Sequence, residues 1–201
     1  FRPMAVPTVL LTGFGPFRDF VVTPNPSWEA VKLLDKERIS GAVIHSQKLD
    51  VEYQHVDKVV PALWNKLSPC LVIHVGVAGT SDCVRLEQCA RNSGYRHADF
   101  ANYVRPSGCC VDGGPRCLRT TLDVGDLQHK VQAEQGMRCE LSSDAGRYVC
   151  DYTMYTSLHF ALQQALPAPV LFVHVPPAGK PYSVAELADA LRTIIRAALS
   201  Q

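Results

Sequence analysis

Short apolar runs bounded by glycine, proline or polar residues alternate along this chain with segments of helical periodicity. Runs of this length and composition are typical of buried β-strands. They lie at residues 8–13, 42–49, 70–76, 138–142 and 169–175, with a more exposed strand predicted at 83–90. Strands that alternate with helices predict an α/β fold, with a mixed, largely parallel sheet covered by helices on both faces.

The helical segments carry their own start signals. Asn25 followed by Pro26 predicts a capped first turn, and Ser183 with Glu186 forms an S-x-x-E capping box before the last helix. Helices are predicted at residues 26–34, 51–67, 123–135, about 145–165 and 183–200. Residues 91–121 contain several glycines and prolines and no clear period, which predicts a long loop.

The size and charge of the chain exclude several classes of protein. A chain of 201 residues, 47% of them hydrophobic, is long enough to bury one substantial core, which predicts a single domain over residues 1–201. Its formal net charge of +1 provides no overall field for nucleic acid or an acidic membrane surface. Apolar stretches such as CLVIHVGVAG are too short to span a bilayer. We therefore expect neither a nucleic-acid nor a membrane partner.

The eight cysteines leave two interpretations open. An even number suggests a secreted protein held by disulfides. Against this, a chain of this size builds a core without them, and Cys70 and Cys150 lie inside apolar segments. No C-x-x-C pair occurs, which argues against zinc or thioredoxin-like chemistry, and the first residues lack a signal-peptide pattern. We predict a reduced, cytosolic protein; the adjacent Cys109 and Cys110 have no explanation in the pattern.

Two histidines and one cysteine are the candidates for chemistry. His74 and His174 each precede the last valine of a predicted buried strand, so both are expected near the rim of the sheet, where α/β active sites gather. Their spacing does not choose between them, and a lone histidine in an apolar strand is more often a hydrogen-bonded core residue than a catalyst. Cys150 follows the run SSDAG at about the fifth residue of a predicted helix, where the helix N-terminus stabilises a thiolate only in part. A structural cysteine is the alternative.

The glycine loop TGFGPF follows the first predicted strand. Its spacing matches neither G-x-G-x-x-G nor the P-loop, so a phosphate site is not supported. Phe14 and Phe17 suit a flat apolar ligand better than a phosphate. The alternative is that both rings fill the core beneath the loop.

Six motifs, in order, resemble the pyroglutamyl-peptidase I family of cysteine exopeptidases. They are LLTGFGPF, NPSWEAV, HVGVAG, LEQCARNSGY, DAGRYVCDYT and FVHVPPAGKPY, and the similarity runs from about residue 8 to residue 199. The resemblance implies an open αβα sandwich and the removal of an N-terminal pyroglutamyl residue from peptides.

The resemblance also assigns roles to individual residues. It implies a Cys-His-Glu triad of Cys150, His174 and Glu87, which makes His74 the core histidine. Phe14 and Phe17 correspond to the phenylalanines that sandwich the pyroglutamyl ring in the family, and Asn25 lies near that pocket. Neither a metal nor an organic cofactor is implied.

Three departures from the family pattern fall in loops expected near the substrate. Arg18 stands where the family usually has glycine after GFGPF, Phe100 replaces asparagine after Asp99, and Gly113 replaces the aspartate of DGP. These changes leave the triad intact and place the shape of the pocket in question. They raise the alternative of a weak or silent paralogue, such as the vertebrate pyroglutamyl-peptidase I-like protein, that binds a partner or a pyroglutamyl peptide.

Overall fold

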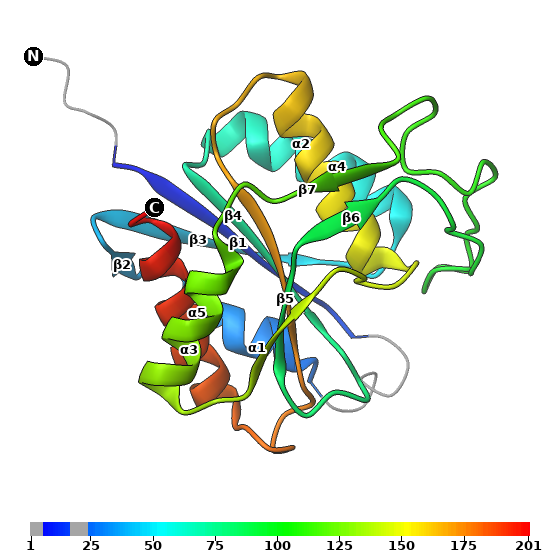
Figure 1. Cartoon of the computed structure of the whole chain (residues 1–201). Coiled ribbons are helices and arrows are strands. Elements are labelled where there is room, and N and C mark those ends of the chain that lie inside the picture. The colour runs from blue at the N-terminus through cyan, green and yellow to red at the C-terminus, as the bar shows by residue number, and fades with distance from the viewer. Residues whose placement is uncertain (1–5, 17–23) are drawn as a thin grey trace, which may run out of the picture.

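A seven-stranded sheet forms the middle of the molecule (Figure 1). The structure is a computed structural model and describes residues 6–16 and 24–201. The strand order is β2-β3-β1-β4-β9-β5-β8. The strands are β1 Thr8–Phe14, β2 Arg38–Ile39, β3 Ala42–Leu49, β4 Leu71–Val77, β5 Val84–Glu87, β8 Cys139–Ser142 and β9 Val170–Val175.

The sheet is mixed and mostly parallel. β1 runs parallel to β3 and β4, β4 to β9, and β5 to β8. Only β2 against β3 and β5 against β9 are antiparallel among the pairs of this sheet that the structure describes. The predicted fold class is confirmed, including the largely parallel character of the sheet.

Helices cover both faces of the sheet (Figure 1). One face packs against α1 Pro26–Lys32, α3 Val124–Gln135 and α5 Val184–Ala198, and the other against α2 Tyr53–Leu67 and α4 Val149–Gln163. Side chains alternate between the faces: Ile73 and Val75 join the α1–α3–α5 core, whereas Val72 and Phe172 join the α2–α4 core. Even-numbered residues of β4 and β9 therefore face the helix that carries Cys150.

The predicted helix caps are confirmed at two positions. The side chain of Asn25 accepts a hydrogen bond from the backbone N–H of Ser27 at the start of α1. Ser183 and Glu186 form both hydrogen bonds of the capping box at the start of α5. Each cap involves residues within one helical turn, so it can be predicted from the sequence without knowing where the helix packs.

The predicted strand at 83–90 is wrong in one respect: it is two strands. β5 ends at Glu87, and β6 Cys89–Arg91 pairs with β7 Cys117–Arg119 in a separate two-stranded ribbon. At Gln88 the backbone N–H donates to the Ser142 carbonyl of the large sheet, while its carbonyl accepts from the N–H of Thr120. This change of partner depends on residues that are distant in the sequence, and so does the pairing of β7, which lies inside the predicted loop. Local patterns therefore predicted neither.

The start of the predicted helix that carries Cys150 is also corrected. Residues 142–147 form a turn in which the Asp144 side chain accepts from the Gly146 N–H and from Arg147. Gly146 has a φ of 88°, in the left-handed region that ends helical structure. α4 therefore begins at Val149, and Cys150 is its second residue.

Candidate active site

Cys150, His174 and Glu87 come together at the carboxyl end of β9. β9 lies between β4 and β5, so Gly76 of β4 is the register partner of His174. Cys150 enters from α4 above: a Cβ added to Gly76 would lie 2.9 Å from the Cys150 Sγ. Gly76 has no side chain, and this leaves room for the Cys150 thiol between α4 and the sheet.

His174 of β9 and Glu87 of β5 form a buried ion pair between these two antiparallel strands. The His174 Nδ1 lies 2.7 Å from the Glu87 Oε1. The two residues are 7% and 1% exposed. The Glu87 Oε2 is buried with no hydrogen-bond partner in residues 6–16 and 24–201. The carboxylate is thus committed to the imidazole and holds its Nδ1 in the protonated form.

Cys150 is the second side chain that acts on the His174 imidazole. Burial lowers the pKa of His174, but the hydrogen bonds and negative charges of Cys150 and Glu87 outweigh it and raise the pKa to about 9. The imidazole is therefore cationic at neutral pH, between a carboxylate and a sulfur. An imidazolium next to a thiol is the arrangement that generates a nucleophilic thiolate.

The position of Cys150 in α4 adds a second source of positive potential. At the second helical residue the thiol lies within the first turn, where the helix dipole acts most strongly. The N-cap residue, Tyr148, makes no side-chain capping hydrogen bond to the helix. Sequence spacing placed Cys150 too deep in the helix, and the turn at 142–147 is the reason.

His74 lies in a different environment from His174. Its Nδ1 is 2.7 Å from the Thr12 Oγ1, and the ring is fully buried. Burial lowers the pKa of His74 to about 3, so this histidine is neutral. The Nε2 has no hydrogen-bond partner in the described part of the chain. His74 is the core histidine of the pair.

The three residues predicted to bind the pyroglutamyl ring are Phe14, Phe17 and Asn25, and the structure describes two of them. Phe14, at the end of β1, is buried, and its ring centroid is 6.4 Å from that of Phe172, which is 4.8 Å from the ring of His174. Phe17 lies outside the described residues. The amide of Asn25 donates to the Gly15 carbonyl at 2.9 Å and accepts from Ser27, so Asn25 ties the glycine loop to α1.

The three departures from the family pattern have different surroundings. Arg18 lies outside the described residues. Phe100 is 48% exposed, beside the buried Asp99, whose carboxylate accepts from the Tyr53 N–H at the start of α2. Gly113 has a φ of 71°, and a Cβ there would meet nothing within 4 Å. Glycine at 113 therefore suits a left-handed backbone in an open part of the loop.

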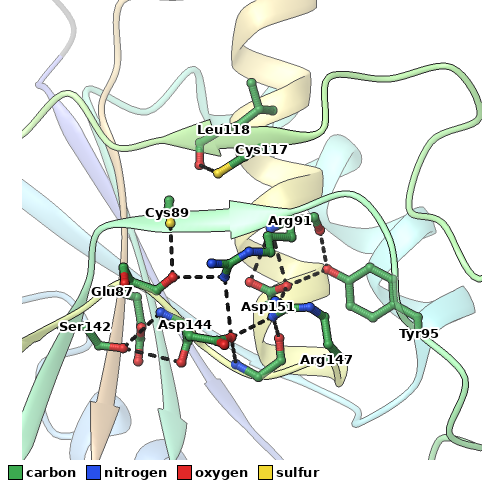
Figure 2. Close-up of polar contacts among 12 residues, drawn as sticks. Glu87, Cys89, Arg91, Tyr95, Cys117, Leu118, Ser142, Asp144, Arg147 and Asp151 are labelled. Atoms are coloured by element: carbon green, nitrogen blue, oxygen red, sulfur yellow. Dashed lines mark hydrogen bonds and ion pairs between the residues drawn. The ribbon is translucent and has the colours of Figure 1, made fainter.

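A buried acid next to Cys150 was not found by sequence reasoning. Asp151 is fully buried, and its carboxylate lies 2.8 Å from the Tyr95 hydroxyl and 3.3 Å from the Arg91 N–H (Figure 2). The Arg147 guanidinium is 3.6 Å away. These contacts fasten β6, which follows Glu87, to the helix that carries Cys150. The only indication in the sequence is an aspartate near the start of a predicted helix. Such aspartates are common on protein surfaces, so this position did not predict a buried acid.

All eight cysteines are free thiols. The adjacent Cys109 and Cys110 lie at the boundary between surface and core, because Cys110 is buried and Cys109 is half-buried. In residues 6–16 and 24–201, no group of three or more His, Cys, Asp or Glu side chains is placed to hold a metal ion. No helix in this part of the chain is long and apolar enough to cross a membrane.

The fold and the cluster define a three-layer α/β protein with a thiol, an imidazole and a carboxylate in contact at the rim of its sheet. The family model described as pyroglutamyl peptidase matches residues 7–190. The chain belongs to the pyroglutamyl peptidase family, a family of cysteine peptidases.

Individual relatives agree with this membership. The chain is 43% identical to the pyroglutamyl-peptidase 1 of Homo sapiens over 189 residues, covering 93% of this chain and 87% of that protein. It is 35% identical to the pyroglutamyl-peptidase 1-like protein of Homo sapiens over 158 residues, covering 79% and 78%. The higher identity favours the peptidase over the paralogue that the loop departures suggested.

Solved structures show the same fold. A mutant pyrrolidone carboxyl peptidase from the hyperthermophile Pyrococcus furiosus superposes with a TM-score of 0.89 at 28% identity, covering 96% of this chain and 98% of that one. The pyroglutamyl peptidase I of Bacillus amyloliquefaciens gives 0.89 at 26% identity, covering 97% and 98%. The resemblance inferred from six motifs therefore extends to the whole architecture.

Proposed function

We propose that this protein hydrolyses the amide bond after an N-terminal pyroglutamyl residue of a peptide, with Cys150 as the nucleophile. The observation that carries the proposal is the contact of His174 with both Cys150 and Glu87, 2.7 Å from the latter, at the start of α4. The three residues come from segments far apart in the sequence and meet only in the fold.

In the proposed mechanism, the Cys150 sulfur attacks the pyroglutamyl carbonyl carbon while His174 holds the thiol proton. His174 then donates that proton to the leaving amine, and the C–N bond breaks to leave an acyl-enzyme. Water, deprotonated by the neutral His174, attacks the thioester and releases pyroglutamate. Glu87 keeps the imidazole oriented and stabilises its cationic form throughout.

The oxyanion of each tetrahedral intermediate needs hydrogen-bond donors. The first backbone N–H groups of α4 have no acceptor within the helix, and Tyr148 supplies no side-chain cap. These amides lie next to the Cys150 thiol and carry the positive end of the helix dipole. They are the donors that we assign to the oxyanion.

The pyroglutamyl ring is a neutral, flat lactam, so shape and apolar contact select it. Phe14 supports this role because its ring lies against Phe172, whose ring in turn lies against His174. We assign Phe17 to the same ring pocket by its position in the motif. Asn25 acts on the pocket by holding Gly15 in place.

Hydrolysis of a chromogenic pyroglutamyl amide tests this function. We expect Cys150→Ala and His174→Ala to abolish turnover, and Glu87→Gln to leave a measurable remnant, because an orienting acid matters less than a nucleophile or base. Cys109→Ser, in the loop, is the matched cysteine control and should retain full turnover. Thermal melts confirm that each variant is folded.

Two results would contradict the proposal. Turnover that survives in Cys150→Ala excludes Cys150 as the nucleophile. A folded wild type that binds a pyroglutamyl aldehyde but does not hydrolyse the amide leaves only the binding function of a silent paralogue.

A further inference from the structure

The ribbon β6–β7 carries two cysteines and two arginines on one face. Cys89 is the register partner of Arg119, and Arg91 is the partner of Cys117. Side chains alternate along each strand, so these four residues share a face. The residues between them, Ala90 and Leu118, point the other way and pack in the α2–α4 core.

The two thiols of this face lie close together. Cys89 and Cys117 occupy a cross-strand diagonal, and diagonal side chains of a twisted two-stranded ribbon are within reach of each other. Each thiol donates to a backbone carbonyl, Cys89 to Ser143 at 3.3 Å and Cys117 to Leu118 at 3.8 Å, and Figure 2 shows one cysteine on each strand of the ribbon. Burial raises the pKa of Cys89, as does the contact with Cys117, while the charges of Arg119 and Arg91 oppose this rise.

The two cysteines differ in accessibility, which suits a two-step exchange. Cys117 is exposed on β7, a three-residue edge strand. Cys89 is 2% exposed and lies behind it. Arg91 and Arg119 flank the pair with positive charge, which attracts an anionic disulfide such as oxidised glutathione.

We propose that Cys89 and Cys117 form a reversible regulatory disulfide by exchange with a glutathione-type disulfide. The Cys117 thiolate attacks one sulfur of oxidised glutathione, whose S–S bond breaks and releases one glutathione. The Cys89 thiolate then attacks the Cys117 sulfur of the mixed disulfide and releases the second glutathione. The protein loses two thiol protons and two electrons, and oxidised glutathione gains both as two thiols.

The disulfide would change the support of the nucleophile's helix. The Cys89 thiol donates to the Ser143 carbonyl at 3.3 Å, in the turn that leads into α4 (Figure 2). A disulfide sulfur has no hydrogen to donate, so this bond is lost on oxidation. Arg91 remains as a donor to the same carbonyl at 2.9 Å. Oxidation thus loosens the turn at 142–147 without releasing it.

The experiment uses the Cys150→Ser protein, so that its outcome is independent of the proposed catalytic role of Cys150. The protein is equilibrated with oxidised glutathione, alkylated, digested without reduction and mapped by mass spectrometry. We expect a peptide pair joined through Cys89 and Cys117 that disappears after dithiothreitol. Adding Cys117→Ser should abolish this pair, whereas adding the matched control Cys109→Ser should leave its yield unchanged.

Hydrogen exchange provides the second readout. Backbone amides at 143–148 should exchange several-fold faster in the oxidised protein than in the reduced one, and the Cys117→Ser variant should show no such difference. The proposal is overturned if oxidation joins other cysteines while Cys89 and Cys117 stay free. It is equally overturned if the pair forms and the exchange of the turn does not change.

Discussion

At the scale of single residues, Gly76 decides whether the thiol and the imidazole can meet. A Cβ at this position would lie 2.8 Å from the Phe172 Cζ and 2.9 Å from the Cys150 Sγ, closer than side chains tolerate. Gly76 is also the register partner of His174. Because Gly76 has no Cβ, α4 can bring the Cys150 thiol close to the sheet next to His174 of β9.

We predict that Gly76→Ala lowers kcat/KM by about 100-fold or more, because a misplacement of about 1 Å at a reacting group has effects of this size. The measurement is hydrolysis of the pyroglutamyl amide, with a thermal melt to show that the variant is folded. Gly79→Ala is the matched control, since a Cβ at Gly79 would meet nothing within 4 Å. Equal kinetics in the two variants would contradict the steric argument.

Asp151 makes a second prediction at this scale. The Tyr95 hydroxyl has one hydrogen, yet its oxygen lies 2.5 Å from the Arg91 carbonyl oxygen and 2.8 Å from the Asp151 Oδ2. This one hydrogen cannot serve both acceptors at once, so Tyr95 satisfies the buried carboxylate only in part. Burial, which the hydrogen bonds from Tyr95 and Arg91 oppose, raises the pKa of Asp151 to about 6.

A raised pKa means that the folded protein binds this proton more tightly than the unfolded chain. The resulting stability is present below the ordinary pKa of 3.8 and is lost as the pH rises through about 6. The shift corresponds to roughly 3 kcal/mol in the free energy of unfolding. In Asp151→Asn, which stays neutral, we expect this decline between pH 4 and 6.5 to disappear in urea titrations. A decline as steep as that of the wild type would exclude Asp151 as its source.

At the scale of elements, the sequence predicted what is encoded locally. Apolar runs and caps identified every strand of the central sheet except the two-residue β2, and the starts of α1 and α5, because these signals depend on neighbours a few residues away. It did not predict the break at Gln88, where the backbone changes partners from Ser142 to Thr120. β7 was missed for the same reason, since three residues have no period and pair only with β6.

Arg105, near the centre of the loop at 91–121, makes several of the contacts that hold this loop. Arg105 donates to the Asp57 carboxylate at 2.9 Å and to the carbonyls of Cys109 and Cys110 at 3.1 and 2.8 Å. Its guanidinium also lies 5.4 Å from the centre of the Tyr152 ring. The loop is thereby tied to both helices on the active-site face, α2 and α4.

We expect Arg105→Met to lower the free energy of unfolding by about 1–3 kcal/mol, because the two loop carbonyls and a carboxylate lose their donor. Urea denaturation provides the measurement. Arg96→Met is the matched control, since Arg96 is an exposed arginine of the same loop. Similar stability in the two variants would mean that the loop is held by other contacts.

At the scale of the whole molecule, the order of strands selects the histidine. His74 and His174 lie in neighbouring strands and on the same face of the sheet, but His174 pairs with Gly76, two residues beyond His74, and spacing in the sequence did not separate them. β9 lies next to β5, which brings Glu87 within 2.7 Å of His174, whereas His74 faces Thr12 of β1. Strand order is set by pairing between segments that are distant in the sequence, so it could not be predicted from spacing. Only the resemblance to a known family identified His174 rather than His74.

This difference between the histidines predicts an alkaline limit for the enzyme. In the proposed mechanism the leaving amine takes a proton from cationic His174, so we expect kcat/KM to fall as the pH rises through about 9, where His174 loses that proton. Replacing Glu87 by Gln removes a negative charge that raises this pKa, and should move the limit down by about one pH unit or more. His74→Gln is the matched control: the pKa of His74 is about 3, so it is neutral over this range and its loss should leave the limit in place. The measurement is the pH dependence of pyroglutamyl amide hydrolysis for the three proteins. A limit that moves in His74→Gln, or stays fixed in Glu87→Gln, would assign the titrating proton to a group other than the His174–Glu87 pair.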